Sequence, residues 1–163
     1  MLSLNIIGAG KVGRVLGRQF VQHRVFQLAH IVTRSVLTAQ QAIAFIGGGV
    51  AVSDATKLVA ADVTMLTVPD DQIASTCAQL AALGLFKPGS IVFHCSGAKA
   101  STELHAASAT AALVASVHPV RSFADPAQVA ANFAGTICSV EGDAAALAVL
   151  ISALQAIQAN VVQ

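Results

Sequence analysis

The sequence predicts one α/β domain, residues 1–163, with a doubly wound, mostly parallel sheet and helices on both faces. Short β-rich runs alternate with segments of helical periodicity along the chain, which is the pattern of βαβ units. Hydrophobic residues make up 55% of the chain and charged residues only 10%. A parallel sheet needs such a composition because its strands are buried on both sides. A length of 163 residues is typical of a single domain.

The predicted elements follow one another without repeats. Strands are expected over residues 2–8, 28–33, 50–52, 62–68, 90–96, 112–118 and 135–140, and the start of another over 160–163. The first helix is expected over residues 12–22. Later helices are expected after the capping residues Ser35, Asp54, Asp70 or Asp71, and Asp143, and the last of them is amphipathic and ends near Asn160.

Polar and glycine-rich segments come directly after several of these strands. They cover residues 8–13, 33–35, 68–71, 96–99 and 118–121. Open parallel sheets bind ligands beyond the carboxyl ends of their strands, where the strand order reverses. We therefore expect these five segments to form the functional edge of the sheet.

The first of them matches the dinucleotide-binding motif G-x-G-x-x-G in the context that the motif requires. Gly8, Ala9, Gly10, Lys11, Val12 and Gly13 lie between an apolar strand and a helix. Gly8 would permit the tight turn, Gly10 would let a pyrophosphate approach the backbone, and Gly13 would let the helix lie close to the strand. The helix N-terminus offers free N–H groups to phosphates. The motif predicts a Rossmann-type nucleotide-binding domain, with a ligand-free glycine turn as the alternative.

The end of the second strand favours NADP over NAD. NAD sites carry an acidic residue here, whereas this chain has Thr33, Arg34 and Ser35. A guanidinium pairs bidentately with a 2′-phosphate, and the hydroxyls add donors. The alternative is a solvated Arg34 beside a helix-capping Ser35.

Five segments together resemble a bacterial two-domain family. They read GAGKVG, TRS, TVPDDQI, HCSGA and SVHPVRSF. The family joins a Rossmann-like domain to a C-terminal helical domain of unknown function. It is related to pyrroline-5-carboxylate reductases, 6-phosphogluconate dehydrogenases and deazaflavin-dependent NADP oxidoreductases. The resemblance covers essentially all of this chain but only the first half of the family.

The resemblance implies further site residues. Val68, Pro69 and Asp70 would pass along the cofactor, and Ser96 and Gly97 would lie near the nicotinamide with His118, which precedes Pro119. His118 and Ser96 are the candidate catalytic residues, with His118 as an acid or hydrogen-bond donor. The residues themselves leave plainer roles open: a strand end and helix cap at Pro69 and Asp70, a turn at Ser96–Ala98, and a hydrogen-bonded loop histidine at 118. His94 is expected to pack inside its strand.

Several classes of partner are excluded by composition and spacing. A net charge of +1 and the lack of Trp and Tyr argue against nucleic acid. Cys77, Cys95 and Cys138 have no metal or redox spacing, and no histidine spacing suggests a metal. The three cysteines are expected to be buried thiols in a reducing compartment. No secretion signal or membrane span is expected, and the protein is placed in the cytoplasm.

Three functions fit these observations. The first is the NADP-binding domain of an oxidoreductase that transfers hydride to or from a small imine, carbonyl or hydroxy substrate. The second is a non-catalytic module that binds or senses NADP(H). The third is an S-adenosylmethionine methyltransferase, which Arg34 disfavours because that cofactor's ribose favours an acid. Because the chain ends after Asn160–Gln163, we expect it to lack the helical domain, to show little turnover, and to form a homo-oligomer through uncovered apolar surface.

Overall fold

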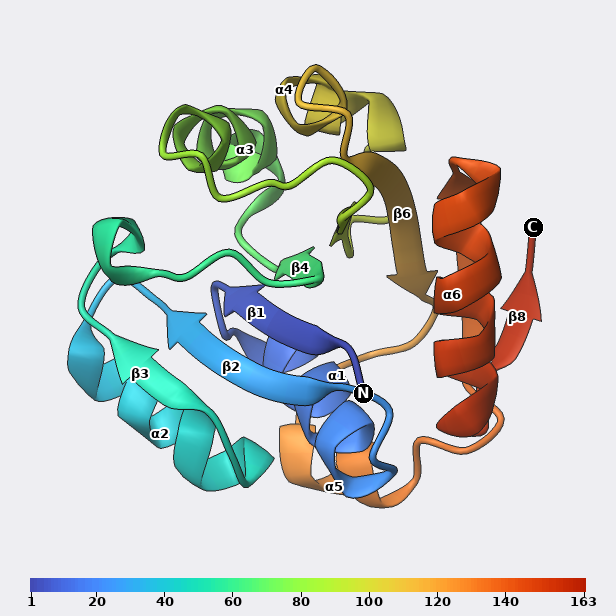
Figure 1. Ribbon diagram of the computed structural model, residues 1–163. Helices are drawn as coiled ribbons and strands as arrows, with labels where there is room; N and C mark the ends of the chain where they lie inside the picture. Colours follow the sequence, from blue (N-terminus) through green and yellow to red (C-terminus); the bar gives the residue numbers. More distant parts are fainter.

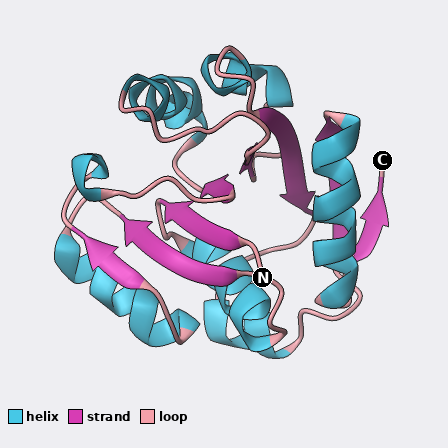
Figure 2. Cartoon of the chain, viewed as in Figure 1, coloured by secondary structure: helices cyan, strands magenta, loops and turns pink.

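An eight-stranded sheet forms the centre of the molecule in the computed structural model, which describes residues 1–163 (Figures 1 and 2). The strand order is β3-β2-β1-β4-β5-β6-β7-β8. The strands are β1 (Ser3–Ile7), β2 (Gln27–Val32), β3 (Val50–Val52), β4 (Val63–Leu66), β5 (Ile91–His94), β6 (Leu113–Pro119), β7 (Ile137–Gly142) and β8 (Asn160–Val162).

The strand directions create a shared functional edge. Strands β1 to β6 are all parallel, whereas β7 runs antiparallel to β6, and β8 is parallel to β7. The mostly parallel sheet predicted from the sequence is thus confirmed. The order reverses between β1 and β4, so the carboxyl ends of these two strands mark the switch point where such sheets bind ligands.

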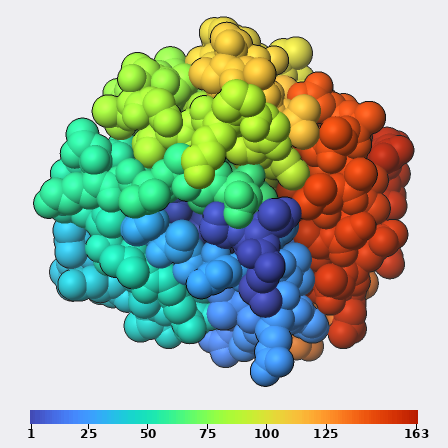
Figure 3. All heavy atoms as spheres, viewed as in Figure 1, coloured from blue at the N-terminus to red at the C-terminus, as the bar shows by residue number.

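Helices cover both faces of the sheet, as predicted. Buried side chains of α1 (Lys11–Gln22), α2 (Val36–Ile46), α5 (Pro126–Ala131) and α6 (Ala144–Ala156) pack into the larger core on one face. Those of α3 (Ile73–Ala82) and α4 (His105–Ser108) pack into a smaller core on the other. Short 3₁₀ turns precede β4, α3 and α4: η1 (Ala55–Lys57), η2 (Asp70–Gln72) and η3 (Ser101–Leu104). Figure 3 shows α6 as one whole side of the molecule, in orange-red.

Two of the predicted helix caps are confirmed. Ser35 accepts a hydrogen bond from the N–H of Thr38 and begins α2, and Asp54 accepts one from the N–H of Thr56 and begins η1. Such caps satisfy N–H groups that the first turn of a helix leaves unpaired. The capping hydrogen bonds also fix the positions of Ser35 and Asp54, which follow β2 and β3, at the functional edge of the sheet.

The prediction that Asp70 or Asp71 caps the next helix is wrong. These residues form the 3₁₀ turn η2, and α3 begins only at Ile73, after Gln72, whose side chain makes no capping hydrogen bond.

The last helix is also shorter than expected. It ends at Ala156 because Gln158 adopts a left-handed conformation, with φ of 62°, and turns the chain into β8. Asp143 precedes the helix, but its Oδ2 accepts the N–H of Val114 at 2.7 Å. The carboxylate therefore ties the start of α6 to β6 and does not cap the helix. Helices α4 and α5 were not expected, because each is too short to show a periodicity.

Cys77 and Cys138 are buried as expected, whereas Cys95 is only partly buried. Burial raises the pKa of the Cys138 thiol to about 11, and it also raises the pKa of Cys77. The pKa of Cys95 is raised by burial and by the neighbouring Cys138. All three thiols are therefore protonated near neutral pH and serve as small apolar side chains. No helix has the length and apolar character needed to cross a membrane.

Candidate functional site: a cavity at the switch point

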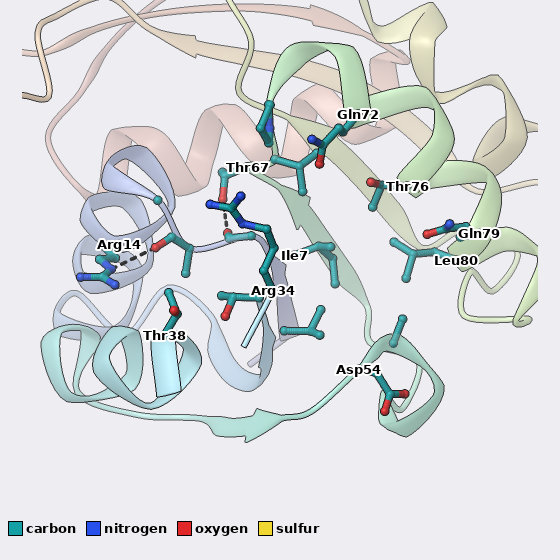
Figure 4. A pocket seen from close by; sticks show the side chains of 18 of the residues that line it. Ile7, Arg14, Arg34, Thr38, Asp54, Thr67, Gln72, Thr76, Gln79 and Leu80 are labelled. Atoms are coloured by element: carbon teal, nitrogen blue, oxygen red, sulfur yellow. Dashed lines mark hydrogen bonds between the residues drawn. The ribbon is translucent and has the colours of Figure 1, made fainter. Parts of the chain in front are cut away.

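A cavity of about 910 Å³ lies beyond the carboxyl ends of β1 and β4, at the switch point of the sheet (Figure 4). The glycine loop, the ends of β2 and β3, the loop after β4 and one side of α3 line it. This volume is at the upper end of the range for small-molecule sites. The cavity is therefore large enough for an extended ligand such as a nucleotide.

The loop after β1 is held against the loop after β4 by backbone contacts. Gly8 has a φ of 79°, which favours glycine. Its N–H donates to the carbonyl of Val32, and its own carbonyl accepts the hydroxyl of Thr67. The turn is therefore fixed from β2 on one side and from β4 on the other.

Gly10 and Gly13 occupy opposite environments. A Cβ on Gly10 would meet no atom within 4 Å, because the residue faces open space in the cavity wall. A Cβ on Gly13 would overlap Thr67 Oγ1 and lie 3.0 Å from the carbonyl oxygen of Gly8. Gly10 thus leaves room for a ligand, whereas Gly13 lets α1 start against the strand ends, as the motif predicts.

Arg34 lies where the sequence analysis expects it. Thr33 and Arg34 line the cavity from the end of β2, and the exposed Arg34 side chain makes no hydrogen bond within the chain. In Figure 4 it extends into the cavity toward the glycine loop. Ser35 does not line the cavity; its hydroxyl caps α2 and contacts the hydroxyl of Thr38 at 2.8 Å.

The remaining predicted cofactor residues divide into two groups. Ala9, Lys11, Val68 and Pro69 line the cavity with Gly8 and Gly10. Val12 and Asp70 do not, and neither do Ser96, Gly97 and His118, which were predicted to lie near the nicotinamide.

Ser96, Gly97 and His118 form a second cluster, at the carboxyl ends of β5 and β6. The His118 ring packs on Gly97 so closely that a Cβ there would lie 2.6 Å from Nε2 and 2.8 Å from Nδ1. The ring is half-buried, and neither of its nitrogens makes a hydrogen bond within the chain. Both ring nitrogens are therefore available for a hydrogen bond to a ligand. The Ser96 hydroxyl instead accepts the N–H of Ala98 at 3.1 Å and shapes the loop.

His94 has a structural role, as expected. Its fully buried ring accepts the N–H of Ser96 at Nδ1, 3.2 Å away, and Nε2 lies 3.0 Å from the carbonyl oxygen of Ala100. An acceptor at Nδ1 and a donor at Nε2 define the neutral tautomer with its proton on Nε2. His94 thereby holds the loop on which Gly97 supports His118.

Several lining residues were missed by the sequence analysis. Arg14 follows the third glycine directly, and Thr38 lies one turn into α2. On the opposite wall, α3 presents Thr76 and Gln79, and Gln72 lies directly before its first residue, as Figure 4 shows. Their spacing of four and three residues places them on one helix face. This spacing of polar residues was the signal in the sequence that could have indicated this wall of the cavity.

Asp54 is the acidic residue of the cavity. Hydrogen bonds from the hydroxyl and N–H of Thr56 lower its pKa, so the carboxylate is ionised at neutral pH. It lies in the wall formed after β3, away from the glycine loop (Figure 4). An anionic ligand group would therefore be repelled from this end of the cavity.

Solved structures of oxidoreductases share this fold. A protein described as an NADP oxidoreductase from Bacteroides fragilis is 13% identical, with a TM-score of 0.82 over 99% of this chain and 61% of its own. Arogenate dehydrogenase from Synechocystis is 19% identical, with a TM-score of 0.79 over 98% and 58%. Pyrroline-5-carboxylate reductase from Coxiella burnetii is 14% identical, with a TM-score of 0.75 over 98% and 58%. The chain thus spans less than two thirds of the length of each.

Sequence comparison identifies the family. No curated protein sequence matches the chain significantly. A family model described as Rossmann-like domain matches residues 1–119, which include the glycine loop, Arg34, the Ser96–Gly97 turn and His118. The chain therefore belongs to the Rossmann-like domain family.

Proposed function

We propose that this chain is the NADP-binding domain of an oxidoreductase acting on a small imine, carbonyl or hydroxy substrate. The observation that carries the proposal is the cavity at the switch point, where the open side of Gly10 adjoins three cationic side chains: Lys11, Arg14 and Arg34. Only one acidic residue, Asp54, lines the same cavity. A polyanionic ligand that lies along a glycine loop fits this combination. Proteins of similar fold, which include an NADP oxidoreductase and a pyrroline-5-carboxylate reductase, support the same proposal.

The residues fit NADP in a definite arrangement. The N–H groups at the start of α1 would hold the pyrophosphate, and Arg34 would pair with the 2′-phosphate. The polar face of α3, with Gln72, Thr76 and Gln79, would accept the adenosine end. When bound, the nicotinamide supplies or accepts the hydride.

His118 is the residue of this chain that we propose moves a proton. Its unpaired ring nitrogens allow it to donate a proton to, or accept one from, a substrate nitrogen or oxygen. The packing against Gly97 limits the orientations of the ring. Gly97, and His94 through the Ser96 backbone, therefore act as positioning residues.

The cofactor choice is tested by changing Arg34 to alanine. We expect the wild type to bind NADPH at least tenfold more tightly than NADH, because a charge-assisted hydrogen bond contributes about 1.5–3 kcal/mol. Arg34→Ala should weaken NADPH binding and leave NADH binding nearly unchanged, as measured by isothermal titration calorimetry. Lys57→Ala, which removes one charge from an exposed residue outside the cavity lining, is the matched control. Equal affinities for the two nucleotides in the wild type would contradict the proposal.

A non-catalytic NADP(H)-binding module is the second candidate. It is favoured by the Ser96 hydroxyl, which is engaged with Ala98, and by the lack of any hydrogen-bonded partner that would activate His118. Single-turnover oxidation of bound NADPH, followed by absorbance with a panel of small cyclic imines and keto compounds, separates the two. In the oxidoreductase, His118→Asn slows this oxidation without changing the affinity for NADPH, whereas exposed His23→Asn does not. A wild type that binds NADPH but oxidises it with no compound of the panel would favour the module.

A further inference from the structure

Arg14 is a cation in the cavity that the glycine motif does not require. It lies in the first turns of α1, which contain no acidic residue, and Lys11 lies three residues before it. Cations near a helix N-terminus are unfavourable, because they face the positive end of the helix dipole. Neither forms an ion pair, since the ion pair of this structure joins Lys99 and Glu103. No acidic residue of the chain therefore offsets the charge of Arg14 at this position.

The Arg14 side chain is held in place at one end and free at the other. Its Nε donates to the Ala9 carbonyl at 2.9 Å, within the glycine loop, and the side chain is half-buried. The two Nη groups make no hydrogen bond within the chain. A planar guanidinium that is anchored through Nε presents its remaining donors in a fixed fork, which suits a phosphate.

The neighbours of Arg14 indicate which phosphate it faces. Arg14, Thr38 and Arg34 line the same half of the cavity, opposite Gln72, Thr76 and Gln79 (Figure 4). The acidic Asp54 lies elsewhere in the wall. A phosphate monoester carries about −1.5 to −2 charges at neutral pH, so a single guanidinium leaves it incompletely neutralised.

We propose that Arg14 is the second cation of the 2′-phosphate subsite and that, with Arg34 and the Thr38 hydroxyl, it determines the preference for NADPH over NADH. This inference rests on the proposed function, because it concerns the same nucleotide cavity. The Nε contact to Ala9 positions the guanidinium, and the Nη groups contact the phosphate.

The test compares the ratio of the NADH and NADPH dissociation constants among variants, by calorimetry at fixed ionic strength. Any disturbance of the glycine loop through Ala9 affects both nucleotides and cancels in the ratio. Arg14→Gln is expected to lower the ratio about tenfold. The double variant Arg14→Gln/Arg34→Ala should bind the two nucleotides equally. Arg14→Lys should recover part of the ratio, because it restores the charge without the fork.

Arg18→Gln is the matched control. Arg18 lies one turn further along α1, is also half-buried, donates to the Phe45 carbonyl at 3.2 Å and does not line the cavity. The ratio of the NADH and NADPH dissociation constants of Arg18→Gln should equal that of the wild type. If Arg14→Gln leaves the ratio unchanged while Arg34→Ala lowers it, the inference is wrong and the proposed function stands. If the wild type itself has no preference for NADPH, both are wrong.

Discussion

Replacing Gly10 with valine is expected to weaken NADPH binding at least hundredfold while the fold is retained. Gly10 precedes α1 and borders the cavity, so a branched side chain would occupy the space in which a pyrophosphate must approach the helix N-terminus. Two charge-assisted hydrogen bonds of about 1.5–3 kcal/mol each would be lost, which corresponds to a factor of at least about one hundred.

The structure predicts little damage to the protein from this substitution. No atom lies within 4 Å of the new Cβ, and the backbone at Gly10 is extended, with φ of −70° and ψ of −163°, so no left-handed conformation is required of the new residue. The loss of a favourable N-cap residue should cost at most about 1 kcal/mol. Calorimetry measures the binding, and thermal unfolding followed by circular dichroism measures the stability.

Gly48→Val is the control for Gly10→Val. It introduces the same side chain at a position where the nearest atom lies 4.0 Å from the new Cβ, and Gly48 is outside the cavity lining. We expect this variant to bind NADPH as the wild type does. Normal NADPH affinity in Gly10→Val would show that the glycine loop is not the phosphate site.

Replacing Gly13 with alanine should have the opposite effect: it should destabilise the fold. The added Cβ would overlap Thr67 Oγ1 and press on the Gly8 carbonyl, which is part of the backbone and is fixed by its hydrogen bond to Thr67. Overpacking of this kind costs about 1–3 kcal/mol in free energy of unfolding. This overpacking cost should exceed the gain of about 1 kcal/mol that alanine brings to a helix interior. We therefore expect the Tm to fall by several degrees.

Gly17→Ala isolates the overlap from the helix propensity. Gly17 lies in the same helix, but its new Cβ would meet the ends of flexible side chains, 2.8 Å from Ile6 Cδ1 and 2.9 Å from Ile46 Cδ1. These ends can shift, so this variant should be clearly more stable than Gly13→Ala in chemical denaturation. Equal stabilities would mean that the contact between α1 and the strand ends is not as tight as the structure indicates.

The sequence by itself determined the fold class and the glycine-loop end of the cavity. The alternation of apolar strands with helices predicts the sheet, and local rules predict the glycine turn, the Ser35 and Asp54 caps and Arg34. These features depend on neighbours within a few residues, which is why the order of residues reveals them. The error at Asp70 and Asp71 arose because a 3₁₀ turn and an α-helix begin with the same residue types.

Only the tertiary structure decided which distant residues meet. Arg14 joins Arg34 and Thr38 because α1 and α2 follow neighbouring strands of the sheet, and the polar stripe of α3 faces them because β4 adjoins β1. His118 rests on Gly97 because β5 and β6 pair in parallel. The antiparallel β7 could not be foreseen either, because the direction in which a strand pairs depends on the path of its connection. Side-chain roles at this site follow from strand order, which no local pattern encodes.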